Sequence, residues 1–152
     1  MIRPNEPFHN ETSTINPKAT RDFTKVLREM QPFWHQAIAD PEAHIAQGLL
    51  PTQRGTALKA DVSFDVLQKH VTLMVRLPLA EELDVPRQRC LFRFQNRPHG
   101  LASVIFDPED RLLLLVSCSV LPDAKAARVV ISRVVAHLLD VLEDEDLHRI
   151  LN

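Results

Sequence analysis

The sequence predicts an α+β domain in which helices pack against an antiparallel sheet, in the order α-(α)-β-β-α-β-β-α. Apolar and polar residues alternate in two segments between positions 58 and 77, as they do in a half-exposed hairpin. Apolar runs on both sides of Asp107-Pro108-Glu109-Asp110 indicate a second hairpin, and the two end regions show helical spacing. Because each element has an apolar side to bury, we expect layers around one core.

The length of the chain and its polar start suggest the domain limits. The 152 residues suffice for one domain with a proper core. Residues 1–16 are polar and contain Pro4 and Pro7, so we expect a mobile N-terminal tail there. Residues 17–152 are then predicted to form the single α+β domain.

The first part of the domain is predicted to be helical. Asn16-Pro17 is a start signal, because Asn can cap free N–H groups and Pro fits the first turn. An apolar stripe follows, made of Phe23, Val26, Leu27 and Met30. Pro32 should end this helix near Met30. Beyond it we expect more helical structure, with an apolar face at Phe33, Trp34, Ala37 and Ile38, a start at Asp40-Pro41 and a stop at Gly48.

The middle of the chain reads as a hairpin and a helix. One strand alternates through Leu58, Ala60, Val62 and Phe64, and the other through Val71, Leu73, Val75 and Leu77. A helix should open near Asp84 and Pro86 and end at Pro98-His99-Gly100, with three residues facing inward, namely Cys90, Leu91 and Phe94.

Two strands and a long helix should complete the fold. Strands are expected at 101–106 and 111–121, and residues 112–116 are apolar on both faces, so this strand should be covered on both sides. The last helix should start at Pro122-Asp123, with an inner face of Ala127, Val130, Ile131, Val134, Leu138, Val141 and Leu142. The acidic run 143–146 indicates either a kink or a solvated turn.

Composition argues against several classes of function. A formal net charge of -2 and a pI near 6.4 give no reason to expect nucleic acid as a partner. The absence of a signal segment and of any apolar run near ~18 residues favours a cytoplasmic protein without membrane insertion. Cys90 and Cys118 both lie in apolar runs, so we expect buried, reduced thiols.

No motif with recognisable catalytic chemistry stands out, so we predict a protein that is not an enzyme and needs no cofactor. The three glycines are too scattered for a phosphate-binding loop, the seven histidines lack metal-ligand spacing, and no GxSxG motif is present. Arg89, Arg93 and Arg97 share one helix face. They form either a solvated or ion-paired face, or a surface that recognises acidic groups; the first interpretation is favoured.

From Leu91-Phe-Arg-Phe-Gln-Asn-Arg-Pro-His-Gly100 through Leu151, the chain resembles the class I type III secretion chaperones, the CesT-like or Tir-chaperone family. The shared pattern is a short helix with an Asn-containing end, a hairpin with an acidic turn, a Pro and a long C-terminal helix. The helix and strand pair upstream fit the first half of the family in order and length, so the resemblance covers roughly residues 17–151.

The resemblance implies a homodimeric, ATP-independent, cytoplasmic chaperone that binds the N-terminal segment of secreted effector proteins and delivers them to a type III secretion system by handing them to the export ATPase. The implied effector contacts are Phe23, Leu27, Val62, Phe64 and Leu73. The implied dimer contacts are Leu91, Phe94, Leu113 and Leu115. An alternative stays open, in which the same fold serves a regulatory adaptor that sequesters another protein without exporting it.

Overall fold

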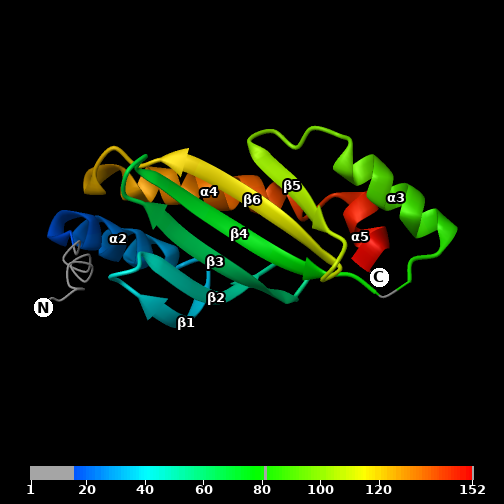
Figure 1. Ribbon diagram of the computed structural model, residues 1–152, viewed down its shortest axis with the longest axis horizontal. Coiled ribbons are helices and arrows are strands. Elements are labelled where there is room, and N and C mark those ends of the chain that lie inside the picture. Colours follow the sequence, from blue (N-terminus) through cyan, green and yellow to red (C-terminus); the bar gives the residue numbers. More distant parts are fainter. Residues whose placement is uncertain (1–15, 81, 152) are drawn as a thin grey trace, which may run out of the picture.

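The structure is a computed structural model that describes residues 16–80 and 82–151. Its six strands form one antiparallel sheet in the order β1-β2-β3-β4-β6-β5 (Figure 1). The strands are β1 (His35–Asp40), β2 (Ile45–Pro51), β3 (Ala57–Asp65), β4 (His70–Pro78), β5 (Ala102–Asp107) and β6 (Leu112–Val120). The helices are α2 (Pro17–Met30), α3 (Val85–Gln95), the short 3-10 turn η1 (Ala124–Ala126), α4 (Ala127–Val141) and α5 (Glu145–Leu151). The predicted tail at residues 1–15 lies outside the described residues.

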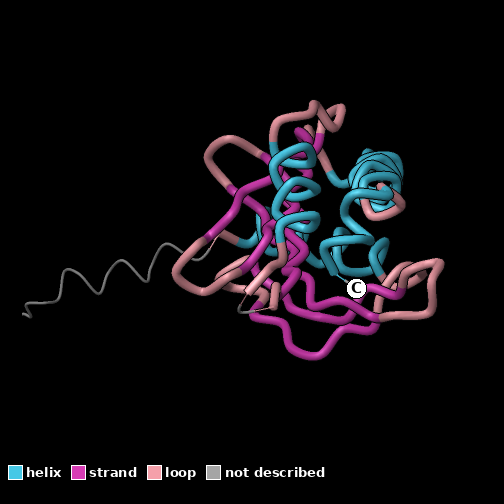
Figure 2. The backbone as a smooth tube through the Cα atoms, turned by 90° about the vertical axis from the view of Figure 1, so that its right-hand side faces the viewer, coloured by secondary structure: helices cyan, strands magenta, loops and turns pink. Residues whose placement is uncertain are grey.

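Helices α2, α4 and α5 lie on one side of the sheet, and the core lies between these two layers, whereas α3 lies beyond the end of the sheet next to α5 and β5 (Figure 2). Helix α4 contacts β4, β5 and β6, and α2 packs beside α4. Alternate residues of the strands are buried on this side, for example Val62, Leu73, Val75 and Leu115. None of the helices in the described ranges is long and apolar enough to cross a membrane.

Local signals account for most element starts. Asn16 accepts a hydrogen bond from the Ala19 N–H at the start of α2, and Asp84 caps α3 in the same way through the Arg87 N–H. Asp107 Oδ1 accepts from the N–H groups of Glu109 and Asp110 in the β5–β6 turn. The predicted order of the two hairpins, the middle helix and the first helix is therefore confirmed.

The helical structure predicted between Phe33 and Gly48 is wrong, because this segment is the β1–β2 hairpin. The Asp40 side chain accepts from the Glu42 and Ala43 N–H groups, so it organises a turn rather than a helix start. Gly48 lies mid-strand, where a Cβ would be 2.7 Å from Trp34 Cε3. The residue is thus small because the indole needs the space, and not because a helix ends there.

The long C-terminal helix is broken at the acidic run. Helix α4 ends at Val141, and Asp144 Oδ1 then caps α5 by accepting from the Asp146 and Leu147 N–H groups. The seven residues predicted for the inner face of the last helix are all buried, as expected. The acidic run 143–146 was predicted to form either a kink or a solvated turn. The structure shows a turn, although Asp146 itself is buried.

The two faces of β6 differ. Leu113 and Leu115 are buried beneath the helices, whereas Leu112, Leu114 and Val116 on the opposite face are only half-buried. We expected β6 to be covered on both faces, but among the described residues only the face toward the helices is covered. Cys118 also points outward and is exposed, so the prediction of two buried thiols holds for Cys90 alone.

Candidate partner-binding surface

The sheet side away from the helices carries a row of apolar residues along β6, with one apolar neighbour on β5 and one on β4, and Arg76 of β4 lies on the same face beside Leu114. Ile105 on β5 stands opposite Leu114 on β6, and Val116 lies between Ser103 and Met74 on its two neighbours. Ile105 is 51% exposed, and the others are half-buried. We call this strip, formed by Met74, Ile105, Leu112, Leu114 and Val116, the open face. A contiguous apolar patch of this kind marks a site of association.

Helix α3 and the loop after it add further apolar surface. Phe92 is 67% exposed and Leu101 66%, and Val85 at the start of α3 is exposed as well. A surface hollow of about 380 Å³ runs along α3, lined by Val85, Gln88, Arg89, Phe92 and Arg93. An exposed aromatic beside an arginine is a composition typical of protein interfaces.

The five residues predicted to contact an effector lie mostly inside the protomer. Phe23, Val62, Phe64 and Leu73 are buried, and Leu27 is half-buried on α2. Phe23 and Phe64 both pack edge-on against His44, whose ring lies between them. These residues join α2 to the sheet, and in this conformation only Leu27 among them reaches the surface.

The residues predicted for a dimer interface show the same pattern. Phe94, Leu113 and Leu115 are buried in the protomer core, and Leu91 is half-buried. The elements named by that prediction nevertheless carry the exposed apolar residues, because Phe92 follows Leu91 on α3 and Leu114 lies between Leu113 and Leu115 on β6. Side chains of a strand point alternately to its two faces, but residues 112–116 are all apolar, so the sequence of β6 does not tell the inner positions from the outer ones.

The arginine stripe of α3 is largely used inside the fold. Arg93 Nη2 donates to Asp146 Oδ1 at 2.9 Å and Arg97 Nη1 to Asp146 Oδ2 at 3.0 Å, while Arg97 also pairs with Asp144. Hydrogen bonding from Arg93, then from Arg97, lowers the pKa of Asp146 to about 2 despite its burial. The favoured interpretation, ion pairs to another element, is confirmed for Arg93 and Arg97. These pairs join α3 to α5.

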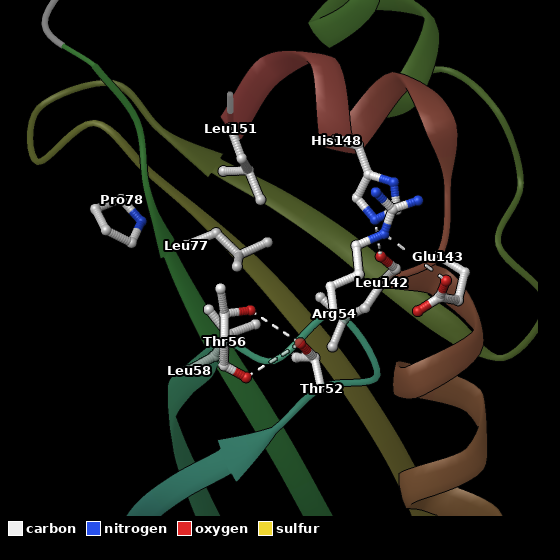
Figure 3. A pocket seen from close by; sticks show the side chains of 10 residues that line it. All are labelled: Thr52, Arg54, Thr56, Leu58, Leu77, Pro78, Leu142, Glu143, His148 and Leu151. Carbon is white, nitrogen blue, oxygen red and sulfur yellow. Dashed lines mark hydrogen bonds and ion pairs between the residues drawn. The ribbon is translucent and has the colours of Figure 1, made fainter.

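A pocket of about 410 Å³ opens between the β2–β3 turn and the end of the helical layer (Figure 3). Its floor is apolar, with Leu58, Leu77 and Leu142 among the lining residues, and Arg54 and Glu143 face each other across its rim with 4.0 Å between Nε and Oε1. His148 Nε2 lies 2.7 Å from the Leu142 carbonyl oxygen. Its size and apolar lining suit one or two apolar side chains of a bound segment.

The described residues show little that resembles a reaction centre. No group of three or more His, Cys, Asp or Glu residues within 16–80 and 82–151 is placed to hold a metal ion. Among the polar groups of the pocket, Thr52 Oγ1 bonds to Thr56 and His148 Nε2 to the backbone, whereas His148 Nδ1 is buried without a partner among the described residues.

Solved structures show the class of fold. A chain of the ExsC–ExsE complex is similar over 88% of this chain and 95% of its own, with a TM-score of 0.53 and 14% identity. A chain of the HopA1–SchA chaperone–effector complex is similar over 82% and 88%, with a TM-score of 0.47 and 20% identity. Neither a family model nor a curated protein matches the sequence.

The protein thus shares its fold with the chain of the ExsC–ExsE complex, and the predicted α+β fold class, an antiparallel sheet packed by helices, is confirmed. The likeness is one of fold, since identity is low in both cases.

Proposed function

We propose that the protein is an ATP-independent chaperone that acts as a cytoplasmic homodimer, holds the N-terminal segment of a secreted effector and passes it to a type III secretion system. The observation that carries this proposal is the open face combined with the fold. A small domain that leaves Ile105, Phe92 and Leu101 in water has apolar surface to cover, and a partner chain covers it.

The homodimer would use the open face and the exposed side of α3. An isologous contact places the same patch against itself, and the strip centred on Ile105 and Leu114 is self-complementary in its apolar character. This proposal keeps the predicted elements, α3 and the β5–β6 hairpin, but moves the contact from Phe94, Leu113 and Leu115 to their outward neighbours.

The effector segment would bind along the other end of the sheet. Strand β1 is an edge strand, so one side of its backbone is free to pair with an extended chain. Leu27 on α2 and Ile38 on β1 offer apolar contact beside that edge. Phe23, Val62, Phe64 and Leu73 would support this surface from beneath.

Affinity capture of the full-length protein followed by mass spectrometry would identify the partner, and a synthetic peptide of its N-terminal segment would then be titrated. We expect a dimer by light scattering, and amide exchange protection confined to β1 and its surroundings when the peptide binds. If the protein is a monodisperse monomer and binds no such segment, the proposal is wrong. If the partner binds but its export does not depend on this protein, the adaptor function is correct instead.

A further inference from the structure

The two helices that cover the sheet carry more positive than negative charge, unlike the rest of the chain. In residues 17–30 and 124–141, lysine and arginine outnumber aspartate and glutamate by seven to three, whereas the rest of the sequence has more acidic than basic residues. A protein with a net charge of -2 therefore has one strongly basic region, on the side of the sheet opposite the open face.

The cations are concentrated along the line where α2 meets η1 and α4. Lys18, Arg21, Lys25 and Arg28 recur every three or four residues, so they share one side of α2. Lys25 and its ion-pair partner Glu29 line a surface hollow of about 450 Å³ together with Ala124, Lys125 and Arg128. We call this hollow and its flanks the basic groove, formed by Arg21, Lys25, Arg28, Lys125 and Arg128.

Four of these five cations have nothing to neutralise them within the fold. Arg21, Arg28, Lys125 and Arg128 are exposed, and none forms an ion pair or a side-chain hydrogen bond within the part of the chain that the structure describes. Arg93 and Arg97 differ in this respect, since both are held by carboxylates of α5. Side-by-side free cations repel each other, and an anionic partner converts that repulsion into attraction.

We propose that the basic groove docks an acidic segment of a partner protein. Charge complementarity selects this occupant, because a peptide bearing several carboxylates can pair with the four unpaired cations beside the hollow. Nucleic acid is the weaker fit, because the five groove residues include no aromatic side chain on which a base can stack. The proposal goes beyond the chaperone function, since the groove lies across the sheet from the open face and either can bind without the other.

The test uses the full-length protein and a fluorescein-labelled peptide of alternating glutamate and alanine, followed by fluorescence anisotropy. The groove variant combines Lys125→Glu and Arg128→Glu, and the control variant combines Lys59→Glu and Lys69→Glu, two exposed residues that belong to neither the groove, the open face nor α3 and that give the same change of net charge. Circular dichroism of both variants verifies that they fold.

We expect the groove variant to bind the peptide about tenfold more weakly than the parent protein, and the control variant to bind within about twofold of it. Binding should weaken between about 50 and 200 mM salt and vanish when glutamine replaces glutamate in the peptide. Equal loss in both variants, or no binding at low salt, would overturn the proposal. Tighter binding of a single-stranded oligonucleotide of equal charge would overturn it as well and identify nucleic acid as the occupant.

Discussion

Asp146 is the residue with the largest electrostatic role in the fold. It is buried at the start of α5 and accepts hydrogen bonds from Arg93 and Arg97, which come from α3 and the residues just after it. The two guanidinium groups are about half exposed, so their contribution is reduced by solvent screening. The pairs still decide where α5 lies, because a charged carboxylate at this depth requires partners.

Replacement Asp146→Asn should destabilise the protein by about 1–2 kcal/mol at pH 7, since it removes charge-assisted bonds to two arginines. Because the folded-state pKa of Asp146 is depressed from 3.8 to about 2, this contribution is present above about pH 4 and is lost as the pH falls toward 2. Urea unfolding of both proteins at a series of pH values measures the difference.

The matched control is Glu145→Gln, which removes a neighbouring carboxylate. This carboxylate is exposed, and its ion pair with Arg149 is long, at 4.0 Å. We expect it to change stability by less than about 0.5 kcal/mol at any pH. A loss for Glu145→Gln as large as that for Asp146→Asn would mean that general charge, and not the arginine contacts, stabilises this end of the molecule.

Gly48 is the residue where backbone approach matters most. Substitution Gly48→Ala would place a Cβ 2.7 Å from both Trp34 Cε3 and the His35 carbonyl oxygen, so the β1–β2 hairpin would have to shift. We expect a loss of about 1–3 kcal/mol in the free energy of unfolding. Trp34 is the only tryptophan, so its fluorescence reports on both stability and local packing. An unchanged emission maximum together with unchanged stability would contradict this account.

Among the elements, the η1–α4 segment depends on a single capping residue. Asp123 accepts from the N–H groups of Lys125 and Ala126, and no side chain caps α4 itself. Replacement Asp123→Ala should cost about 1 kcal/mol in the free energy of unfolding, as for other lost N-caps. Thermal or urea unfolding checks this value.

Asp110→Ala is the control for the cap, because Asp110 is an exposed turn residue whose carboxylate is not needed for the β5–β6 turn, where Asp107 is the acceptor. Its effect should stay within about 0.5 kcal/mol. If both alanine variants lose the same stability, the loss reflects a change in surface charge and the cap has no special role.

At the scale of the whole molecule, the open face should control assembly. Replacement Ile105→Asp places a charge at the most exposed residue of the open face, so an interface formed there would lose contact area and gain an unpaired buried carboxylate. We expect a monomer by light scattering, with the stability of the protomer changed by less than about 1 kcal/mol because the side chain points outward.

Leu67→Asp provides the comparison, since Leu67 is 94% exposed in the β3–β4 turn and lies outside the open face. This variant should keep the oligomeric state of the parent protein. If the Ile105→Asp variant remains a dimer, the dimer interface lies elsewhere on the surface. The self-association proposed for β5 and β6 would then be wrong.

The sequence correctly predicted those helix starts and turns that depend only on residues close to each other in the chain. The caps at Asn16 and Asp84 and the turn at Asp107 act through neighbouring N–H groups, so they can be read directly. Asp40 misled the prediction because the same side chain-to-backbone bonds open a helix or close a hairpin, and only the pairing of β1 with β2 distinguishes the two.

For the candidate sites, the sequence identified the elements but not the exposed residues. The apolar run of β6 and the helical spacing in α3 marked both elements as apolar, yet the choice between Leu113 inside and Leu114 outside depends on which face the helices cover. The sequence did not predict the basic groove, because its two halves, on α2 and on η1–α4, are about a hundred residues apart in the chain.

The sequence by itself therefore determined the α+β class, the two central hairpins, the capped helices and the inner stripe of α4, because propensity, capping and periodicity act locally. Only the tertiary structure decided that residues 35–51 pair as strands, that Arg93 meets Asp146 across 53 positions of the chain, and that one face of the sheet stays open. Those outcomes depend on contacts between distant elements, whose geometry exists only after the layers have packed.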